Sequence, residues 1–149
     1  MVKLRTNTTM RTLIVDDDAV SRRVLLEIIK PYGECEQAAS GREALAAFTS
    51  CLDTKPFDLV LLDIQMPDID GQETLAAIRA IEARRGVPSQ LGVKVIMATV
   101  NTDKTSIFTA FRNQCEAYLI KPVTSEAVVV TLEQFGLIPW SRGANGPEN

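Results

Sequence analysis

Polar and charged side chains follow four short apolar runs of this sequence, where they could act together. They are Asp16, Asp17 and Asp18 after Thr12–Val15, Asp63 after Leu59–Leu62, Thr99 after Val93–Ala98, and Lys121 after Ala117–Ile120. Carboxylates only a few ångströms apart raise one another's pKa, so a cluster of them is unfavourable unless a cation shares the site. Oxygen ligands without histidine or cysteine favour a hard cation such as Mg²⁺. The acids therefore predict a magnesium site.

The other side chains of this set fit the transfer of a phosphoryl group. Asp63 is a carboxylate nucleophile that can form an acyl phosphate. Lys121 would supply a positive charge to the phosphoryl oxygens, and Thr99 would supply a hydroxyl donor. Positioning and charge stabilisation are most of what phosphoryl transfer requires. We therefore take Asp63, Thr99 and Lys121 as the candidate catalytic residues.

Each of these features has an ordinary structural explanation when it is taken alone. The acids Asp16–Asp18 suit the first turn of a helix, where the helix dipole favours negative charge. Asp63 could belong to a turn, Thr99 could cap a helix, and the Lys121–Pro122 pair could lie in a solvated turn. All of these explanations would have to hold at once, at successive strand ends, so the functional interpretation is favoured.

The apolar pattern predicts five strands that alternate with five helices. The predicted strands cover residues 12–15, 35–39, 57–62, 93–98 and 117–120, and the predicted helices cover 20–29, 41–48, 72–84, 102–113 and 125–135. Ser40, with Glu43 three residues later, predicts a capping box at the second helix, and Asp70 is the predicted cap of the third. Such alternation indicates an α/β fold with a parallel sheet between helices. Ligands of such sheets bind beyond the carboxyl ends of the strands, where the candidate residues lie.

The composition limits the classes of protein and of site that fit. The 149 residues suffice for one domain, and we divide them into a flexible lead-in at 1–10, a folded domain at 11–140 and a disordered tail at 141–149. The net charge of −3 gives no reason to expect binding to nucleic acid. No apolar run suits membrane insertion or a secretory signal, so we expect a cytoplasmic protein. The sequence has no histidine to act as a base or ligand, and its three widely spaced cysteines predict free thiols.

Four separated segments resemble the signature segments of CheY-like receiver domains of bacterial two-component response regulators. They are Leu13–Asp18, Asp63–Gly71, Met97–Thr99 and Tyr118–Pro122. The resemblance covers residues 10–136, nearly all of the predicted domain, and the four segments occur in the family's order. It implies a flavodoxin-like sheet of five parallel strands in the order 2-1-3-4-5, flanked by five helices.

The resemblance implies a role for each residue of the metal site. Asp63 is the phosphoacceptor, and it ligates Mg²⁺ directly, together with Asp17 and the backbone carbonyl of Gln65. Asp16 acts mainly through water. The phosphoryl group comes from a sensor histidine kinase or a histidine phosphotransfer protein. The chain is then a signalling domain rather than an enzyme, and it catalyses only its own phosphorylation and dephosphorylation.

The resemblance also implies how the signal leaves the site. Thr99 and Lys121 bind the phosphoryl group. Thr99 and Tyr118 form a switch pair, in which the hydroxyl moves toward the phosphoryl group and the ring turns inward behind it. The bond before Pro122 is expected to be cis. The face made by the fourth helix, the fifth strand and the fifth helix then changes its preference for a downstream protein, and we expect a single-domain regulator.

Two departures from the family and three other functions bear on this interpretation. Val100 follows Thr99 where the family usually has a smaller residue, which predicts restricted access to the site, and the stretch 83–92 is longer than usual. An aspartate-nucleophile phosphatase would need an acid at the position of Gln65. A flavodoxin-like cofactor carrier would need a phosphate loop rich in Gly, Ser and Thr in place of Asp16–Asp18. A degenerate receiver that binds partners without phosphorylation stays open because of Val100.

Overall fold

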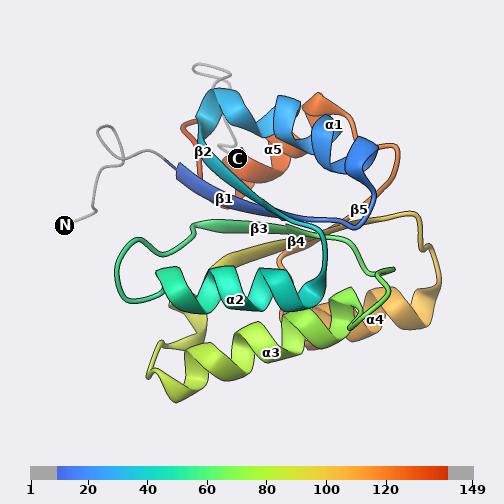
Figure 1. Ribbon diagram of the computed structural model, residues 1–149. Coiled ribbons are helices and arrows are strands. Elements are labelled where there is room, and N and C mark those ends of the chain that lie inside the picture. Colours follow the sequence, from blue (N-terminus) through green and yellow to red (C-terminus); the bar gives the residue numbers. More distant parts are fainter. Residues whose placement is uncertain (1–9, 141–149) are drawn as a thin grey trace.

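The computed structural model describes residues 10–140 and contains one sheet of five parallel strands (Figure 1). The strands are β1 (Met10–Val15), β2 (Gly33–Ala38), β3 (Leu59–Leu62), β4 (Lys94–Thr99) and β5 (Ala117–Ile120). Their order across the sheet is β2-β1-β3-β4-β5, so the predicted order 2-1-3-4-5 is confirmed. The carboxyl ends of all five strands therefore lie at one edge of the sheet.

Five α-helices cover the two faces of this sheet. They are α1 (Ala19–Ile29), α2 (Gly41–Cys51), α3 (Gly71–Arg84), α4 (Lys104–Arg112) and α5 (Ser125–Gln134), with short 3₁₀ turns at Lys30–Tyr32 and Ser89–Leu91. Figure 1 shows α1 and α5 on one face and α2, α3 and α4 on the other. The three-layer α/β arrangement that the alternating pattern predicts is confirmed.

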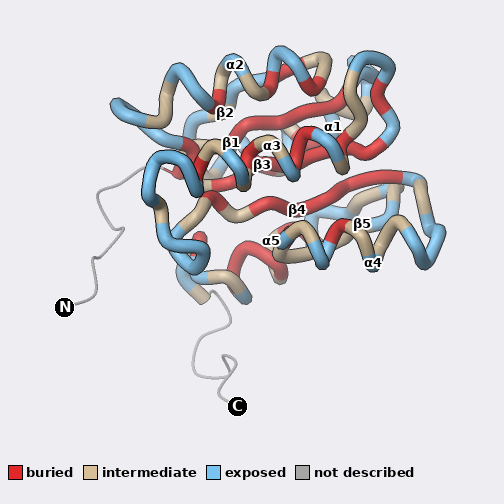
Figure 2. The backbone as a smooth tube through the Cα atoms, turned by 90° about the horizontal axis from the view of Figure 1, so that it is seen from below, coloured by how far each residue is buried: buried red, intermediate tan, exposed pale blue. Residues whose placement is uncertain are grey.

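The three central strands are apolar on both faces because each face packs against helices. On β1, Leu13 faces the layer of α2, α3 and α4, and Ile14 faces the layer of α1 and α5; both side chains are fully buried. Figure 2 shows buried backbone along β1, β3 and β4. The edge strands β2 and β5 are mostly half-buried or exposed. Strands buried on both faces form continuous apolar runs, which is why the central ones are easy to predict.

The structure differs from the sequence-based prediction at some element boundaries. Met10, assigned to the lead-in, is instead the first residue of β1, where it pairs with Gly33 and is 3% exposed. Phe57, predicted to begin a strand, is buried ahead of β3, whose pairing with β1 starts at Leu59. Apolar side chains just outside a ladder can thus be buried as deeply as those within it. Residues 1–9 of the predicted lead-in and the predicted tail at 141–149 lie outside the described residues.

Ser40 caps α2 as predicted, but Glu43 does not complete the predicted capping box. The Ser40 side chain accepts from the Glu43 N–H at 3.1 Å, whereas Glu43 Oε1 accepts from the Ala39 N–H at 2.8 Å, one residue before the cap. The reciprocal pair lies at α3. There the Asp70 carboxylate accepts from the Glu73 N–H at 2.9 Å, and Glu73 Oε1 accepts from the Asp70 N–H at 3.0 Å. This box fixes the start of the helix that follows β3.

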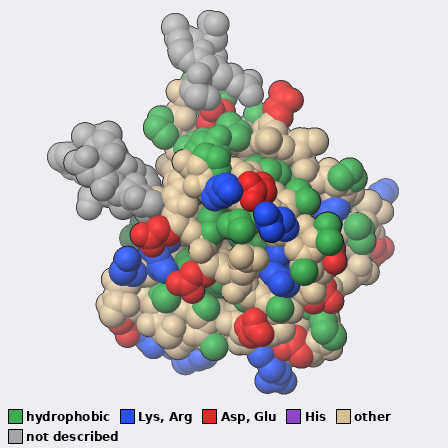
Figure 3. Space-filling model, turned by 45° about the horizontal axis from the view of Figure 1, so that its top comes forward, with side chains coloured by type: hydrophobic (Ala, Val, Ile, Leu, Met, Phe, Trp, Pro, Cys, Tyr) green, Lys and Arg blue, Asp and Glu red, His purple; other side chains and the backbone are tan. Residues whose placement is uncertain are grey.

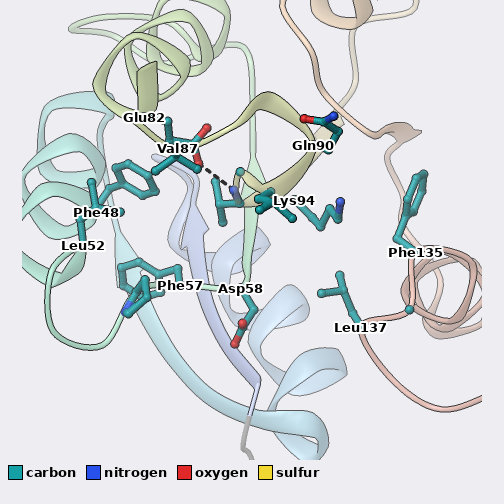
Figure 4. A pocket seen from close by; sticks show the side chains of 15 residues that line it. Phe48, Leu52, Phe57, Asp58, Glu82, Val87, Gln90, Lys94, Phe135 and Leu137 are labelled. Carbon is teal, nitrogen blue, oxygen red and sulfur yellow. Dashed lines mark hydrogen bonds between the residues drawn. The ribbon is translucent and has the colours of Figure 1, made fainter. Parts of the chain in front are cut away.

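The long stretch before β4 lies at the opposite end of the sheet from the candidate residues. A hollow of about 470 Å³ opens there, near the end of α2, the start of β4 and the residues after α5 (Figure 4). Glu82 of α3 lines it and accepts from the Val93 N–H at 2.7 Å. Arg79 donates to Glu82 and to the Val93 carbonyl, both at 2.8 Å. These contacts anchor the stretch beside the amino ends of the strands, remote from Asp63.

Candidate functional site

Four strand ends bring the predicted site residues to the same edge of the sheet. Asp16 follows β1, Asp63 follows β3, Thr99 ends β4 and Lys121 follows β5. The Asp63 N–H donates to the Val15 carbonyl at 3.0 Å, and the Lys121 N–H donates to the Thr99 carbonyl at 2.9 Å. Strand-like hydrogen bonding therefore continues one residue past β3 and β5, so these side chains project from a firm support.

The carboxylates of Asp16, Asp17 and Asp63 form a compact cluster. One oxygen of each lies within 4.8 Å of the others. Asp16 is fully buried and Asp63 is 7% exposed, whereas Asp17 is exposed. The cluster therefore has a buried floor and an open side, and its carboxylate oxygens are the donors that suit a hard divalent cation such as Mg²⁺.

Lys121 places its ammonium group between two of these acids. Its Nζ donates to Asp16 Oδ2 at 2.6 Å and to Asp63 Oδ2 at 3.1 Å, and it lies 3.4 Å from Ser21 Oγ on α1. The bond between Lys121 and Pro122 is cis. The ammonium group is thus within reach of any group that Asp63 carries.

The charges at the site do not balance. Burial raises the pKa of Asp16, although Lys121 and the Asp18 N–H act in the opposite direction. Burial would also lower the pKa of Lys121, but its contacts with Asp16 and Asp63 outweigh this effect and the pKa is raised. The ammonium group contacts two of the three carboxylates in the cluster, and a divalent cation would relieve the remaining repulsion. The residues present fit the Mg²⁺ site that the sequence predicts.

The connection from β3 to α3 passes close to Asp63. The Gln65 N–H donates to Asp63 Oδ1 at 3.3 Å, which keeps Gln65, the predicted carbonyl ligand, beside the acid. The Gly71 N–H donates to the Ile64 carbonyl at 2.8 Å. A Cβ on Gly71 would lie 2.1 Å from the Asp63 carbonyl oxygen, so glycine is what allows α3 to start this close to the predicted nucleophile.

The two predicted switch residues share a partner that the sequence does not reveal. Thr99 is fully buried, and its Oγ1 accepts from the Asn101 N–H at 3.3 Å. The Tyr118 hydroxyl donates to the Asn101 carbonyl at 2.8 Å. The Asn101 side chain donates to Ser106 Oγ at 3.1 Å and accepts from the Asp103 N–H at 2.8 Å. Asparagine and aspartate before a helix signal a turn and a cap, but no local pattern indicates the contact with Tyr118.

Comparison with known proteins decides which family has this fold and this cluster. The family model described as the response regulator receiver domain matches residues 12–133 of the sequence. The chain belongs to this family. The matched stretch contains every predicted site residue from Asp16 to Pro122, so the receiver domain and the candidate site coincide.

The relatives of this receiver domain include a small chemotaxis protein and a large kinase. It is 31% identical to the chemotaxis protein CheY of Listeria monocytogenes over 125 residues, which are 84% of this chain and 98% of that protein. It is 41% identical over 88 residues to the histidine kinase CKI1 of Arabidopsis thaliana, which are 52% of this chain but only 8% of the kinase. A solved CheY-like receiver domain from Methanospirillum hungatei is 29% identical, with a TM-score of 0.70, and the match covers 87% of this chain and 96% of the other. The predicted CheY-like fold is confirmed.

An apolar groove of about 310 Å³ lies beside Lys121 in this receiver domain. Its lining includes Val20 and Val24 of α1 and Val100 after β4, which are 71%, 47% and 59% exposed. Val100 thus contributes to an exposed apolar surface next to the site. The restricted access expected from this residue stays a prediction.

The face of the receiver domain that carries α1 and α5 has charges of both signs (Figure 3). Figure 3 shows Lys and Arg side chains interspersed with Asp and Glu on the side that carries α1 and α5. Within residues 10–140, no helix combines the length and the apolar character that crossing a membrane requires. The cysteines are free thiols, as predicted: Cys35 and Cys51 are half-buried and Cys115 is buried.

Proposed function

We propose that this receiver domain is a single-domain response regulator that takes a phosphoryl group onto Asp63 with the help of Mg²⁺. The donor is a phosphohistidine on a sensor histidine kinase or a histidine phosphotransfer protein in the cytoplasm. The supporting observation is the convergence of charges at one sheet edge. Asp63 shares a cluster with Asp16 and Asp17 and lies 3.1 Å from the ammonium group of Lys121.

The transfer depends mainly on charge and position. A carboxylate oxygen of Asp63 bonds to phosphorus as the bond from phosphorus to the donor's imidazole nitrogen breaks, and the electron pair of that bond returns to the nitrogen. Lys121, already beside Asp63 Oδ2, pairs with a phosphoryl oxygen. Asp17, Asp63 and the Gln65 carbonyl would hold Mg²⁺, with Asp16 acting through water, and the bound ion would supply positive charge to the phosphoryl oxygens.

The switch acts through the connection between β4 and α4. The Thr99 hydroxyl, which now accepts from the Asn101 N–H, turns to donate to a phosphoryl oxygen, and the Tyr118 ring turns inward behind it. The α4–β5–α5 face then changes its binding preference, as a population shift between two states. The α4 helix carries Phe108 and Phe111, which are 64% and 47% exposed. Exposed aromatic side chains favour a protein as the downstream target.

Intact-mass measurement with a small phosphodonor tests the proposal. Acetyl phosphate and Mg²⁺ should add one phosphoryl group to the native chain and none to Asp63→Asn, because an amide is not a carboxylate nucleophile. EDTA should prevent the labelling of the native chain. Asp53→Asn is the matched control, since Asp53 is an exposed acid paired with Arg85 at 2.7 Å, and it should be labelled normally. Equal labelling of Asp63→Asn and the native chain would refute the assignment.

A further inference from the structure

The middle of the β3–α3 connection is tied to α2, a helix that contributes no acid to the cluster. Asp68 Oδ1 accepts from the Gly41 N–H at 3.3 Å, and Asp68 Oδ2 accepts from the Arg42 N–H at 3.2 Å. These are the first two N–H groups of α2, and the third, that of Glu43, donates to Ser40 Oγ at 3.1 Å. Asp68 therefore caps α2 from another segment of the chain.

Electrostatics favour this contact. The start of a helix presents N–H groups without intrahelical partners and a partial positive charge, and both suit a carboxylate. Desolvation works to raise the pKa of Asp68, but the backbone N–H groups of Ile69, Arg42 and Gly41 hold it below its usual value. Asp68 is thus ionised at neutral pH, in the form that binds the helix.

The same contact fixes the path of the segment that carries Gln65. At its start, the segment is held by the Gln65 N–H, which donates to Asp63 Oδ1 at 3.3 Å. Three residues later, Asp68 is held by α2. The segment approaches α2 so closely that a Cβ on Gly41 would lie 2.5 Å from the Ile69 side chain. Gln65 therefore sits between two polar anchors, one on the predicted phosphoacceptor and one on α2.

We propose that Asp68 is a positioning residue for the metal site: by holding the β3–α3 connection on the start of α2, it sets the Gln65 carbonyl and the Asp63 carboxylate for Mg²⁺. This inference rests on the proposed function, because it concerns the metal site proposed there. Both Asp68 oxygens are engaged by α2, so Asp68 acts through the connection rather than as a ligand. Outer partners of this kind commonly tune metal affinity.

Titration with Mg²⁺, followed through the backbone amide resonances of Asp17 and Gln65, measures this effect. Asp68→Ala should weaken Mg²⁺ binding about tenfold, as the loss of an outer partner does when the ligands themselves are intact. The Mg²⁺ affinity of Asp68→Asn should lie between that of Asp68→Ala and that of the native chain, because the amide oxygen of asparagine can accept one of the two hydrogen bonds. The readout is metal binding alone, with no phosphodonor present.

Ser40→Ala is the matched control, because it removes the other cap of α2 without touching the connection. We expect both Ser40→Ala and Asp68→Ala to lower the stability of the chain, because each removes a cap of α2, but Ser40→Ala should leave the Mg²⁺ affinity unchanged. Equal weakening of Mg²⁺ binding by both variants, or native affinity in Asp68→Ala, overturns the inference. If circular dichroism shows that Asp68→Ala does not fold, Asp68→Asn is used in its place, and a native Mg²⁺ affinity in Asp68→Asn overturns the inference.

Failure of the proposed function has a different signature. A native chain whose amide resonances do not respond to Mg²⁺ would overturn the metal site as a whole. Asp17→Ala removes an acid of the cluster itself, and it should abolish the response that Asp68→Ala only weakens. A native response with no difference between the native chain and Asp68→Ala would overturn the role of Asp68 and leave the metal site standing.

Discussion

Lys121 supplies the positive charge that compensates Asp16 and Asp63 at the sheet edge when no metal is bound. Its side chain is 16% exposed, and that of its partner Asp16 is not exposed at all. Removing one member of such a pair leaves a buried charge without compensation, which is far more destabilising than losing an exposed pair. The contact of Lys121 with Asp63 adds to this dependence, because the same ammonium group serves both acids.

Lys121→Met keeps the aliphatic stem and removes the charge. We expect the free energy of unfolding in EDTA to fall by about 3 kcal/mol, since Asp16 loses its buried partner, and excess Mg²⁺ to restore part of the loss. Urea unfolding with EDTA and with Mg²⁺ measures both. Lys55→Met, which removes an exposed pair with Glu34 at 3.8 Å, should change stability by less than about 1 kcal/mol. Native stability of Lys121→Met in EDTA would contradict the pairing.

The same pair predicts how the difference between the native chain and Lys121→Met depends on pH. The pKa of Lys121 is raised above its ordinary value of 10.5 in the folded chain, because Asp16 and Asp63 outweigh desolvation. Its contribution to stability is therefore complete below pH 10.5 and is lost as the pH rises through the higher folded pKa. The stability difference should shrink in that range, and a difference that stays constant there would contradict the assignment.

At the scale of elements, the connection from β4 to α4 joins the predicted switch to the start of a helix. Asn101 contacts both switch residues through its backbone and the first turn of α4 through its side chain. Asp103 caps this turn by accepting from the Ser106 N–H at 3.2 Å, and Gln72 of α3 donates to the Ser106 carbonyl at 2.8 Å. A movement of Thr99 is thereby linked to the position of α4 through contiguous hydrogen bonds.

Asn101→Ala removes the side-chain hydrogen bonds to Ser106 and Asp103. Each is worth about 1 kcal/mol, so their joint loss of about 2 kcal/mol should speed up amide hydrogen exchange in the first turn of α4 about thirtyfold while β4 is unaffected. Thr124→Ala is the matched control, because Thr124 caps α5 by accepting from the Ala127 N–H at 3.1 Å. It should speed up exchange in α5 alone. Unchanged protection of α4 in Asn101→Ala would show that Asn101 does not anchor this helix.

An element or a site residue can be predicted from the sequence when the contacts that define it are local in the chain or follow from the sheet topology. It cannot be predicted when they join residues that are far apart in the sequence. Asp63 was predictable because the buried run before it makes a strand, and parallel strands align their carboxyl ends. Asp68 was not, because its partners lie 27 and 26 residues away and meet it only once the connection has folded. Tyr118 likewise finds its acceptor 17 residues away. Even a local motif can mislead, since Glu43 bonds to Ala39 rather than back to the cap.

At the scale of the whole molecule, the sheet separates two apolar cores, and Cys115 lies in the one shared by α2, α3 and α4. It is 7% exposed. Burial and then Glu116 raise its pKa to about 12, against the effect of Arg79. About one thiol in ten thousand would then be ionised at pH 8, and the thiolate is the reactive form. Cys115 is both buried and largely un-ionised in the folded chain. Its rate of reaction with a thiol reagent therefore reports on the opening of this core.

A chain with Cys35→Ser and Cys51→Ser keeps Cys115 as its one thiol. We expect its reaction with an aromatic disulfide at pH 8 to be about a thousandfold slower in the native chain than in urea, because the thiol must wait for the core to open. If that opening is global, Mg²⁺ should slow the reaction further, since a ligand of the native state depletes every unfolded form. Lys121→Met should speed it up in EDTA. If neither Mg²⁺ nor Lys121→Met changes the reaction rate, the core opens locally at α4 while the acids that follow β1 and β3 stay in place.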